Sequence, residues 1–334
     1  MSGFKSSERA ARRLKRRDRD LRCGRGFSAE LERTLQQVLD LLGVLYPELR
    51  RWLALNLAIL TVAMLQLWRG ARSGHGHLTL GALSRAMPLR EREKMRSKRL
   101  SRLLRNRFVE GSHMTPLLVR LALGPHPQGW IPIVVDQTTI RGTPTLMAGI
   151  RLAGRVVPVA FTCFEYAGLY KSQNALELGL FALVAASLPP GCKPLFLMDR
   201  GYARVDLLIR LRQLGIPFII RGRGKTLVAG GGKARALGRL PHRRGQVCRY
   251  RSIRYHRTKQ EKVDVVIFHD PTFQEPWYLL VPADCEAQLP SATVVTLYRQ
   301  RMQIELTFRD WKTHLGVRGL RLEWILPPDW SACC

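Results

Sequence analysis

The chain has 334 residues, enough for one large domain and a smaller one or two, and its 46% hydrophobic and 24% charged residues are ordinary for a folded globular protein. Its charge is not ordinary, because 55 Lys and Arg residues against 25 Asp and Glu residues give a net charge of +30. Such an excess repels itself unless a polyanion lies nearby, so the composition favours nucleic acid as the partner. A ribosomal-type structural protein and a protein that binds anionic membranes are the alternatives.

The cysteines and the N-terminus bear on the cellular compartment. Seven cysteines include no Cys-x-x-Cys pair and no His at zinc-finger spacing, which favours a reducing, cytoplasmic or nucleoid-associated setting. The N-terminus is polar and basic, without a secretory signal. One uncharged run, Trp52 to Trp68, reaches about the minimum length of a membrane span. Arginines flank it on both sides and Asn56 and Gln66 interrupt it, so we expect a buried helix and no membrane partner.

The N-terminal part of the chain is basic and helical. Residues 1–26 are rich in Lys and Arg and poor in apolar residues, which predicts a mobile basic arm that contacts DNA or is simply solvated. Residues 27–124 are predicted to form an all-α DNA-binding region, with helices over 30–45 (Ser28 as N-cap), 49–68, 78–88 and 95–106. The last of these is amphipathic, and its cations either form a DNA-binding face or only solvate the helix. Basic residues are dense around it: Arg85, Arg90, Arg92, Lys94, Arg96, Lys98, Arg99, Arg102, Arg105 and Arg107.

From residue 130 the hydrophobic pattern changes from helical to strand-like. Apolar runs predict strands over 131–135, 146–152, 156–164, 194–198 and 216–221, with helices over 173–188 and 205–214. The second and third runs are joined at Ala153-Gly154, a hairpin signal, and Gly215 ends the second helix. The order βββ-α-β-α-β over 130–221 predicts an α/β fold with a ribonuclease H-like core, a mixed five-stranded sheet flanked by helices.

Two further segments complete the predicted core. Residues 222–290 are rich in Gly at first and then alternate, which predicts a β-rich insertion; the Gly-rich start lacks the Gly-Lys-Ser/Thr ending of a phosphate loop. Residues 291–322 contain the predicted catalytic helix, in which YRQRMQIELTFRDWK runs unbroken by Gly or Pro. At about 100° per residue, four of its side chains fall within a stripe about 60° wide: Tyr298, Arg301, Glu305 and Lys312.

Three carboxylates in this arrangement predict a metal site. Asp136 and Asp199 each follow an apolar strand, and in this topology the two strands are neighbours, so both side chains can converge with Glu305 from the last helix. Three close carboxylates repel one another unless a hard cation joins them. Oxygen ligands favour Mg²⁺ or Mn²⁺ over zinc, and two ions about 3.5–4 Å apart would serve an in-line phosphoryl transfer.

These motifs resemble the DDE transposases of bacterial insertion sequences, in the group marked by a Tyr-x2-Arg-x3-Glu-x6-Lys signature. Tyr298, Arg301, Glu305 and Lys312 match that spacing without a gap, and VVDQTT and LFLMDRGYA resemble the first and second acidic motifs of the family. The resemblance covers roughly residues 130–322. It implies cut-and-paste DNA transposition: hydrolysis at the element ends, a hairpin intermediate and strand transfer, catalysed by Asp136, Asp199 and Glu305 with Mg²⁺ or Mn²⁺.

The resemblance also implies roles for the surrounding residues. Tyr298, Arg301 and Lys312 would hold phosphates of double-stranded DNA at the transposon end, Arg221 and Arg223 would contact DNA, and Trp277 would stack a flipped base. The alternatives are that both aromatic residues belong to the core, that Arg221 is a surface cation and that Glu305 pairs with an arginine of its own helix.

The C-terminal sequence departs from the family pattern. Residues 323–334 are short and broken by prolines, where the family continues with a long apolar helix used to pair two subunits. We therefore expect an atypical tail, with truncation as one explanation, and a homodimer whose assembly is in doubt. A catalytically inactive DNA-binding remnant and a structure-selective nuclease of the same fold are the alternative functions.

Overall fold

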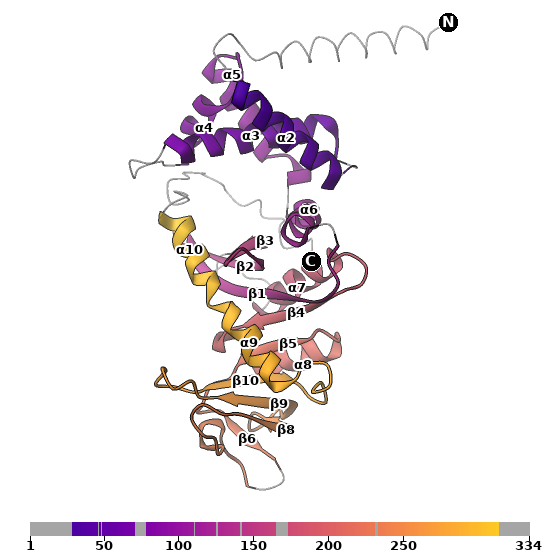
Figure 1. Ribbon diagram of the computed structural model, residues 1–334, viewed down its shortest axis with the longest axis vertical. Coiled ribbons are helices and arrows are strands. Elements are labelled where there is room, and N and C mark those ends of the chain that lie inside the picture. The colour runs from indigo at the N-terminus through magenta and orange to yellow at the C-terminus, as the bar shows by residue number, and fades with distance from the viewer. Residues whose placement is uncertain are drawn as a thin grey trace, which may run out of the picture. The chain divides into compact units, whose positions relative to one another are not determined.

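A computed structural model describes residues 29–45, 47, 49–70, 78–109, 111–124, 126–140, 142–164, 173–230 and 233–313 (Figure 1). These residues divide into two compact units, 29–109 with 310–313 and 111–309. The predicted basic arm over 1–26 and the atypical tail over 323–334 lie outside the described residues.

The first unit is helical, as its periodicity predicts. It contains α2 (Ala29–Leu45), α3 (Arg51–Gly70), α4 (Leu80–Ala86) and α5 (Glu93–Leu104). Thr79 caps α4 by accepting a hydrogen bond at Oγ1 from the amide of Ala82, at 3.0 Å. α3 packs against the other three helices. The unit therefore has one small core built around α3, with these buried members: Leu53, Ile59, Val62, Leu100 and Leu103.

Helix α3 covers the uncharged run that approaches the length of a membrane span. By length and composition alone it is the single described helix that could cross a membrane, which is weak evidence because buried helices meet the same criterion. Here α3 packs against three helices, and the side chain of Asn56 is 1% exposed and accepts a hydrogen bond from Nε of Arg99 at 2.7 Å. Only 33% of the apolar window of α3 is buried, so α3 packs against its neighbours but is not the fully buried helix that the sequence predicts.

The second unit begins with a mixed sheet whose five strands are those predicted from the apolar runs. Strands β1 to β3 pair antiparallel, while β1, β4 and β5 are parallel, in the order β3-β2-β1-β4-β5. Ala153 and Gly154 have φ values of 47° and 75°, as the tight turn between β2 and β3 requires. The elements of this half are α6 (Gly111–Leu123), β1 (Gly129–Ile140), β2 (Thr143–Leu152), β3 (Arg155–Cys163), α7 (Gln173–Ala186), β4 (Cys192–Met198), α8 (Val205–Gln213) and β5 (Phe218–Arg221).

Helix α6 was not predicted, and it belongs to the sheet unit. It contains Pro116, which weakens its helical pattern, and it packs on β2, β3 and α7. Val119 and Ala122 of α6 join the hydrophobic core together with α7 and α8. The first compact unit therefore ends before α6, while the chain stays helical through α6 to Leu123.

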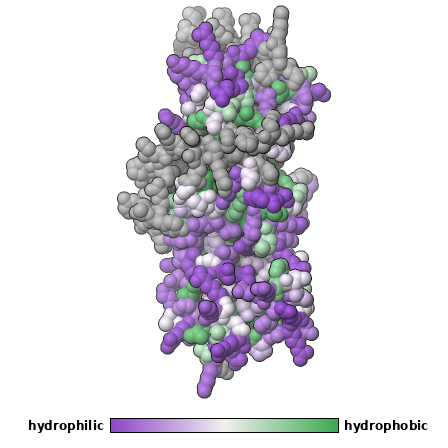
Figure 2. Space-filling model, turned by 90° about the vertical axis from the view of Figure 1, so that its left-hand side faces the viewer, coloured by the Kyte–Doolittle hydropathy of each residue, from purple (hydrophilic) through white to green (hydrophobic). Residues whose placement is uncertain are grey.

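The predicted β-rich insertion extends the same sheet rather than forming a separate one. Strand β10 (Trp277–Pro282) pairs antiparallel with β5 and continues through β9 (Glu261–Phe268) and β8 (Val247–Tyr255) to β6 (Leu227–Ala229) and β7 (Arg235–Ala236), giving a ten-stranded sheet. Pairing with β10 satisfies the backbone groups that β5 would otherwise expose at a sheet edge. Hydrophilic residues cover most of the coloured surface in Figure 2, and apolar residues lie there in small separate patches.

Two consecutive helices, α9 (Ser291–Arg301) and α10 (Gln303–Thr313), run across the sheet in Figure 1. The sequence predicts one unbroken helix here, but Met302 lies in a turn between the two. Around it the hydrogen bonds tighten to a three-residue spacing, from Met302 N to the carbonyl of Arg299 at 3.4 Å and from Glu305 N to the carbonyl of Met302 at 3.3 Å. The predicted stripe is therefore divided between two helices.

Both helices are held against the sheet. α9 packs on β4, β8 and β9. In α10 the buried hydroxyl of Thr307 donates to the carbonyl of Val156 and accepts from its amide, both at 3.0 Å. Arg151 also donates from Nε to the Gln303 side chain at 2.9 Å. These contacts fix the start of α10, where Glu305 lies.

Candidate active site

Two of the predicted acids lie at matching positions on neighbouring parallel strands. β1 pairs with β4 up to Val134 and Leu197, and Asp136 and Asp199 each stand two residues beyond that pair. Neighbouring strands lie about 4.8 Å apart and side chains alternate between faces. The register therefore sets the two aspartates side by side on one face. This is the face opposite the core formed with α6, α7 and α8, and α9 packs against it at β4.

The place of Asp136 in its strand differs from the prediction. The apolar run stops at Val135, which predicts a strand end, but β1 continues to Ile140 because its antiparallel pairing with β2 continues. What stops before Asp136 is the pairing with β4. Asp136 thus lies where β1 and β4 part, while Asp199 directly follows β4.

The carboxylate of Asp136 is partly buried and surrounded by charge. Its Oδ1 accepts a hydrogen bond from the Gln137 amide at 2.8 Å, and its Oδ2 lies 3.6 Å from Nη1 of Arg301. Burial raises the pKa of Asp136 above its ordinary value although Arg301 acts to lower it, and the charges of Asp199 and Glu305 raise it further. The three predicted acids are therefore close enough to influence one another electrostatically.

Asp199 and Glu305 are presented differently. Asp199 caps the short 3-10 helix η4 (Arg200–Tyr202), and its Oδ1 accepts a hydrogen bond from the Gly201 amide at 2.7 Å. Glu305 is exposed in the first turn of α10. Within the described ranges no group of three or more His, Cys, Asp or Glu residues is arranged so that it could hold a metal ion. The donor set of three carboxylates nevertheless has the oxygen chemistry that Mg²⁺ and Mn²⁺ prefer.

Arg301 is a buried cation with unused hydrogen-bonding groups. It is 8% exposed, and in the part of the chain that the structure describes its Nε and Nη1 have no hydrogen-bond partner. Burial acts to lower the pKa of Arg301, but Tyr298, Asp136 and Asp199 outweigh it and raise this pKa above its ordinary value. Two unsatisfied N–H groups beside an acidic site are suited to an oxyanion such as a phosphate.

Tyr298 and Trp277 pack against each other in the core. They are 2% and 7% exposed, and their ring centroids are 5.3 Å apart in an edge-on contact. Phe273, which is 50% exposed, stacks on Trp277 with a centroid distance of 6.0 Å. Burial raises the pKa of Tyr298, and the charges of Arg301 and Arg221 oppose that shift. Both rings are core aromatics in this structure, so Trp277 presents no open face for a base.

The other predicted cations lie around β5 and at the end of α10. Arg221 ends β5 and forms an ion pair with Glu275, with 3.4 Å between Nη2 and Oε2. Arg223 is exposed and donates from Nε to the carbonyl of Arg200 at 3.1 Å, which links it to the turn after Asp199. Lys312 lies on α10 about two turns after Glu305.

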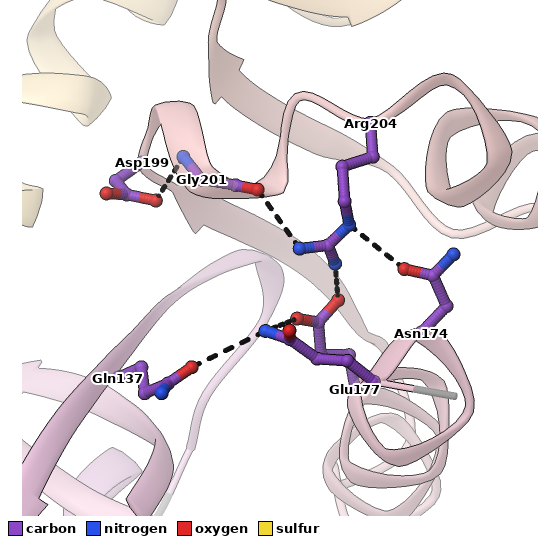
Figure 3. A network of polar contacts seen from close by, with 7 residues as sticks. Gln137, Asn174, Glu177, Asp199, Gly201 and Arg204 are labelled. Atoms are coloured by element: carbon purple, nitrogen blue, oxygen red, sulfur yellow. Dashed lines mark hydrogen bonds and ion pairs between the residues drawn. The ribbon is translucent and has the colours of Figure 1, made fainter. Parts of the chain in front are cut away.

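A polar network that the sequence pattern did not predict lies behind Asp199. Figure 3 shows Glu177 of α7 beside Arg204, which also contacts Asn174 and the carbonyl of Gly201. Gln173 donates to Oε1 of Glu177 at 3.0 Å. The sequence did contain a signal, because Glu177 is an acid within a strongly apolar helix. In the structure this residue is 1% exposed.

The cations of α5 separate into two sets. Arg96 donates to the carbonyls of Arg85 and Met87 at 3.2 Å, and Arg99 binds Asn56 and Glu91, so these two arginines hold the helical unit together. The remaining set is exposed at three- and four-residue spacing and lies along one face of the helix: Lys94, Lys98, Arg102 and Arg105. The predicted cationic face therefore excludes the two internal arginines.

Comparison with known proteins points to one family. Residues 171–323 match the family model of the transposase DDE domain. The match spans a little under half of the chain, includes Asp199, Glu305 and the Tyr298 to Lys312 signature, and begins after Asp136. No curated protein matches the chain. Among solved structures the chain is similar to the cryo-EM structure of a piggyBac transposase synaptic complex with hairpin DNA, at 10% identity and a TM-score of 0.41, over 86% of this chain and 70% of that one. At this level the likeness to that structure does not bear on the function.

Proposed function

We propose that the protein is a DDE-type transposase that moves DNA by a cut-and-paste route, with hydrolysis at element ends, a hairpin intermediate and strand transfer into target DNA. The observation that carries the proposal is the register that sets Asp136 beside Asp199 on one face of the sheet. The match of residues 171–323 to the transposase DDE domain supports it. In this proposal β1 to β5 form a ribonuclease H-like core, and the chain is one of the insertion-sequence transposases with the Tyr-Arg-Glu-Lys signature.

Asp136, Asp199 and Glu305 would hold the metal in this function. The charges of Asp199 and Glu305 both raise the pKa of Asp136, a repulsion that a shared hard cation would relieve. Glu305 is exposed, so its side chain is free to turn toward the aspartates. Two bound Mg²⁺ or Mn²⁺ ions would activate a water or 3′-hydroxyl and stabilise the leaving oxygen of an in-line phosphoryl transfer.

The protein's own residues would place the DNA. Arg301 would bind phosphate oxygens of the DNA through Nε and Nη1, the two nitrogens that lack hydrogen-bond partners among the described residues. Tyr298, which is buried, would orient that guanidinium rather than contact the transposon end itself, and Trp277 would stack an unpaired base once Phe273 moves off its ring. Further phosphates of the end would be held by the remaining cations of the site: Lys312, Arg221 and Arg223.

The helical unit would bind double-stranded DNA through α5. Its three exposed cations and the C-cap residue Arg105 share one face and are spaced to meet successive phosphates. Two transposon ends must be joined for cut-and-paste movement, so the proposal includes a homodimer that holds both ends.

The test is cleavage of an end-labelled duplex that carries the terminal sequence of the element, with Mg²⁺ and with EDTA. The wild type should nick the duplex only with Mg²⁺, and Asp199→Asn should lower the rate at least about 10³-fold, because catalytic residues of one site act as a unit. Asp206→Asn is the matched control, since Asp206 is an exposed Asp of α8 that pairs with Lys259. This control should cleave like the wild type.

Two outcomes would contradict the proposal. Tight binding of the terminal duplex without cleavage by the wild type would indicate a catalytically inactive DNA-binding remnant. Metal-dependent cutting of branched DNA, with no preference for the terminal sequence, would indicate a structure-selective nuclease of the same fold.

A further inference from the structure

An ion pair between a buried glutamate and a partly exposed arginine lies behind the turn that carries Asp199. Glu177, in the apolar helix α7, is 1% exposed and pairs with Arg204. Burial raises the pKa of Glu177 above its ordinary value, although Arg204 and Gln173 act to lower it. A buried carboxylate is destabilising unless it is paired and hydrogen-bonded. We therefore expect the charge of Glu177 to have a structural role that an apolar side chain could not fill.

Arg204 uses its planar guanidinium to join α7 to the turn after Asp199 (Figure 3). Its Nη2 contacts Oε2 of Glu177, its Nε donates to Oδ1 of Asn174 at 3.0 Å, and its Nη1 donates to the carbonyl of Gly201 at 3.0 Å. The guanidinium of Arg204 is rigid and planar. Its contacts with Glu177 and Asn174 on α7 therefore also fix the position and orientation of the Gly201 peptide.

The same turn holds the Asp199 carboxylate. The amide of Gly201 donates to Oδ1 of Asp199 at 2.7 Å, while the carbonyl of Gly201 accepts from Arg204. The Tyr202 ring next to it is 4% exposed, with the Arg204 guanidinium 5.8 Å from its centroid. The turn is therefore held by polar contacts and by packing. The contacts form a continuous series from Glu177 through Arg204 and Gly201 to Asp199.

We propose that Glu177 and Arg204 are positioning residues that hold the Asp199 carboxylate in the orientation needed to share a metal ion with Asp136. This inference rests on the proposed function. Glu177 is not itself a ligand, because Arg204 occupies one of its carboxylate oxygens and Gln173 the other. Asp199 keeps Oδ2 for the ion, since the Gly201 amide binds Oδ1. Residues that orient metal ligands in this way typically change metal affinity or activity by about 10- to 100-fold when they are mutated.

The experiment compares Glu177→Gln and Arg204→Lys with a matched control, Glu261→Gln, in the full chain. Glu261 is also a buried glutamate paired with a more exposed arginine, Arg212 of α8, with 2.5 Å between Oε1 and Nε. Among the described residues, this pair joins β9 to α8 and leaves the turn after Asp199 untouched. Mn²⁺ is titrated into each protein and followed by electron paramagnetic resonance, and backbone hydrogen–deuterium exchange is measured at Gly201. Cleavage of the terminal duplex is measured per folded molecule.

In the two positioning variants we expect Mn²⁺ affinity and cleavage to fall about 10- to 100-fold, and the Gly201 amide to exchange faster. Glu261→Gln should leave all three unchanged. The inference is wrong if Glu177→Gln and Glu261→Gln behave alike, or if exchange at Gly201 does not change in either positioning variant. If the wild type neither binds Mn²⁺ nor cuts DNA, the proposed function fails, and the metal-orienting role fails with it. If the wild type binds Mn²⁺ and cuts DNA, the comparison of the positioning variants with Glu261→Gln decides whether Glu177 and Arg204 orient Asp199.

Discussion

Two ion pairs in the sheet unit each contain a buried carboxylate, and they connect different parts of the fold. Glu177 and Arg204 join α7 to the turn that carries Asp199. Arg249 and Asp264 join β8 to β9, with side chains 4% and 1% exposed and 2.8 Å between Nη2 and Oδ2. The first pair is linked to a predicted catalytic residue, whereas the second belongs to the extension of the sheet.

Each ion pair makes further hydrogen bonds to other groups, and these bonds show which parts of the fold the pair connects. Arg249 also donates from Nη1 to the carbonyl of Leu289 at 2.8 Å, and Asp264 accepts from the amide of Ser252 at 2.9 Å. Ser252 has φ of 51° at an irregularity of β8, and Leu289 precedes the N-cap residue of α9. This pair therefore fixes the start of the helix that carries Tyr298 and Arg301. Burial alone does not reveal the role of an ion pair; the groups bonded to its two ends do.

The largest expected effect comes from breaking the pair in the extension. Asp264→Ala should lower the free energy of unfolding by about 3–5 kcal/mol, because it leaves the Arg249 guanidinium buried without a counter-ion. Urea unfolding followed by circular dichroism measures the change. Replacing both residues by apolar ones, Arg249→Met with Asp264→Leu, should recover most of the loss. A change below about 1 kcal/mol in the single variant, as for an exposed pair, would contradict this account.

A smaller loss of stability is expected where α10 is anchored. Thr307→Val keeps the shape of the side chain but removes the hydroxyl that bonds both the amide and the carbonyl of Val156. Leaving these buried groups without partners should cost about 1–3 kcal/mol of unfolding free energy. Thr296→Val is the control, because Thr296 is exposed on α9 and, among the described residues, its hydroxyl donates only to the carbonyl of Ala292 within its own helix. Equal losses in the two variants would show that Thr307 is not an anchor.

The pair behind Asp199 should make stability depend on pH. Burial holds the pKa of Glu177 above its ordinary value of 4.5, so on raising the pH the unfolded chain loses this proton before the folded chain does. The stabilisation is complete below pH 4.5 and is lost as the pH rises to the folded pKa. The stability of the wild type relative to Glu177→Gln should therefore fall across that window and then level off. A relative stability that rises with pH would mean that Arg204 dominates over burial.

The smallest effect on stability is expected at the exposed cations of α5. Changing Lys94, Lys98 and Arg102 together to Gln should leave the unfolding free energy nearly unchanged and weaken DNA binding. The slope of log K against log salt should become less steep by about 0.9 for each DNA phosphate that the variant no longer neutralises. The matched control removes three exposed cations of the sheet unit: Arg210, Arg239 and Lys262. An equal weakening in the control would mean that net charge, and not the α5 face, is responsible.

Local patterns predicted most elements because their causes are local. The helices α2 to α5 follow from apolar residues at helical spacing, and β8, β9 and β10 follow from the alternation that predicts a β-rich insertion over 222–290. The break at Met302 was not predictable, because no Gly or Pro marks it and the helix tightens only where it packs on the sheet. The continuation of β1 past Asp136 was missed because its polar residues resemble a strand end, whereas pairing with β2 decides it.

The residues of the candidate site also fall into those that local sequence predicts and those that only the fold brings together. Asp136, Asp199 and Glu305 were found from their neighbours in sequence, but Glu177 and Arg204 were not, because their pairing depends on packing α7 behind the turn after β4. Trp277 shows most clearly what a local pattern cannot predict. It stands at the start of a strand, and the sequence around it does not tell whether its ring is open to a base or covered by Phe273.

The sequence by itself determined the charge that favours DNA, the order of helices and strands, and the spacing of Tyr298, Arg301, Glu305 and Lys312. These depend on composition and on backbone periods of 3.6 and 2 residues, which act over short stretches of chain. The tertiary structure alone decided that Asp136 and Asp199 share a register, that Arg301 is buried with unused donors, and that Glu177 is linked to Asp199 through Arg204. Those relations depend on burial and on contacts between residues far apart in the chain, and no local pattern records them.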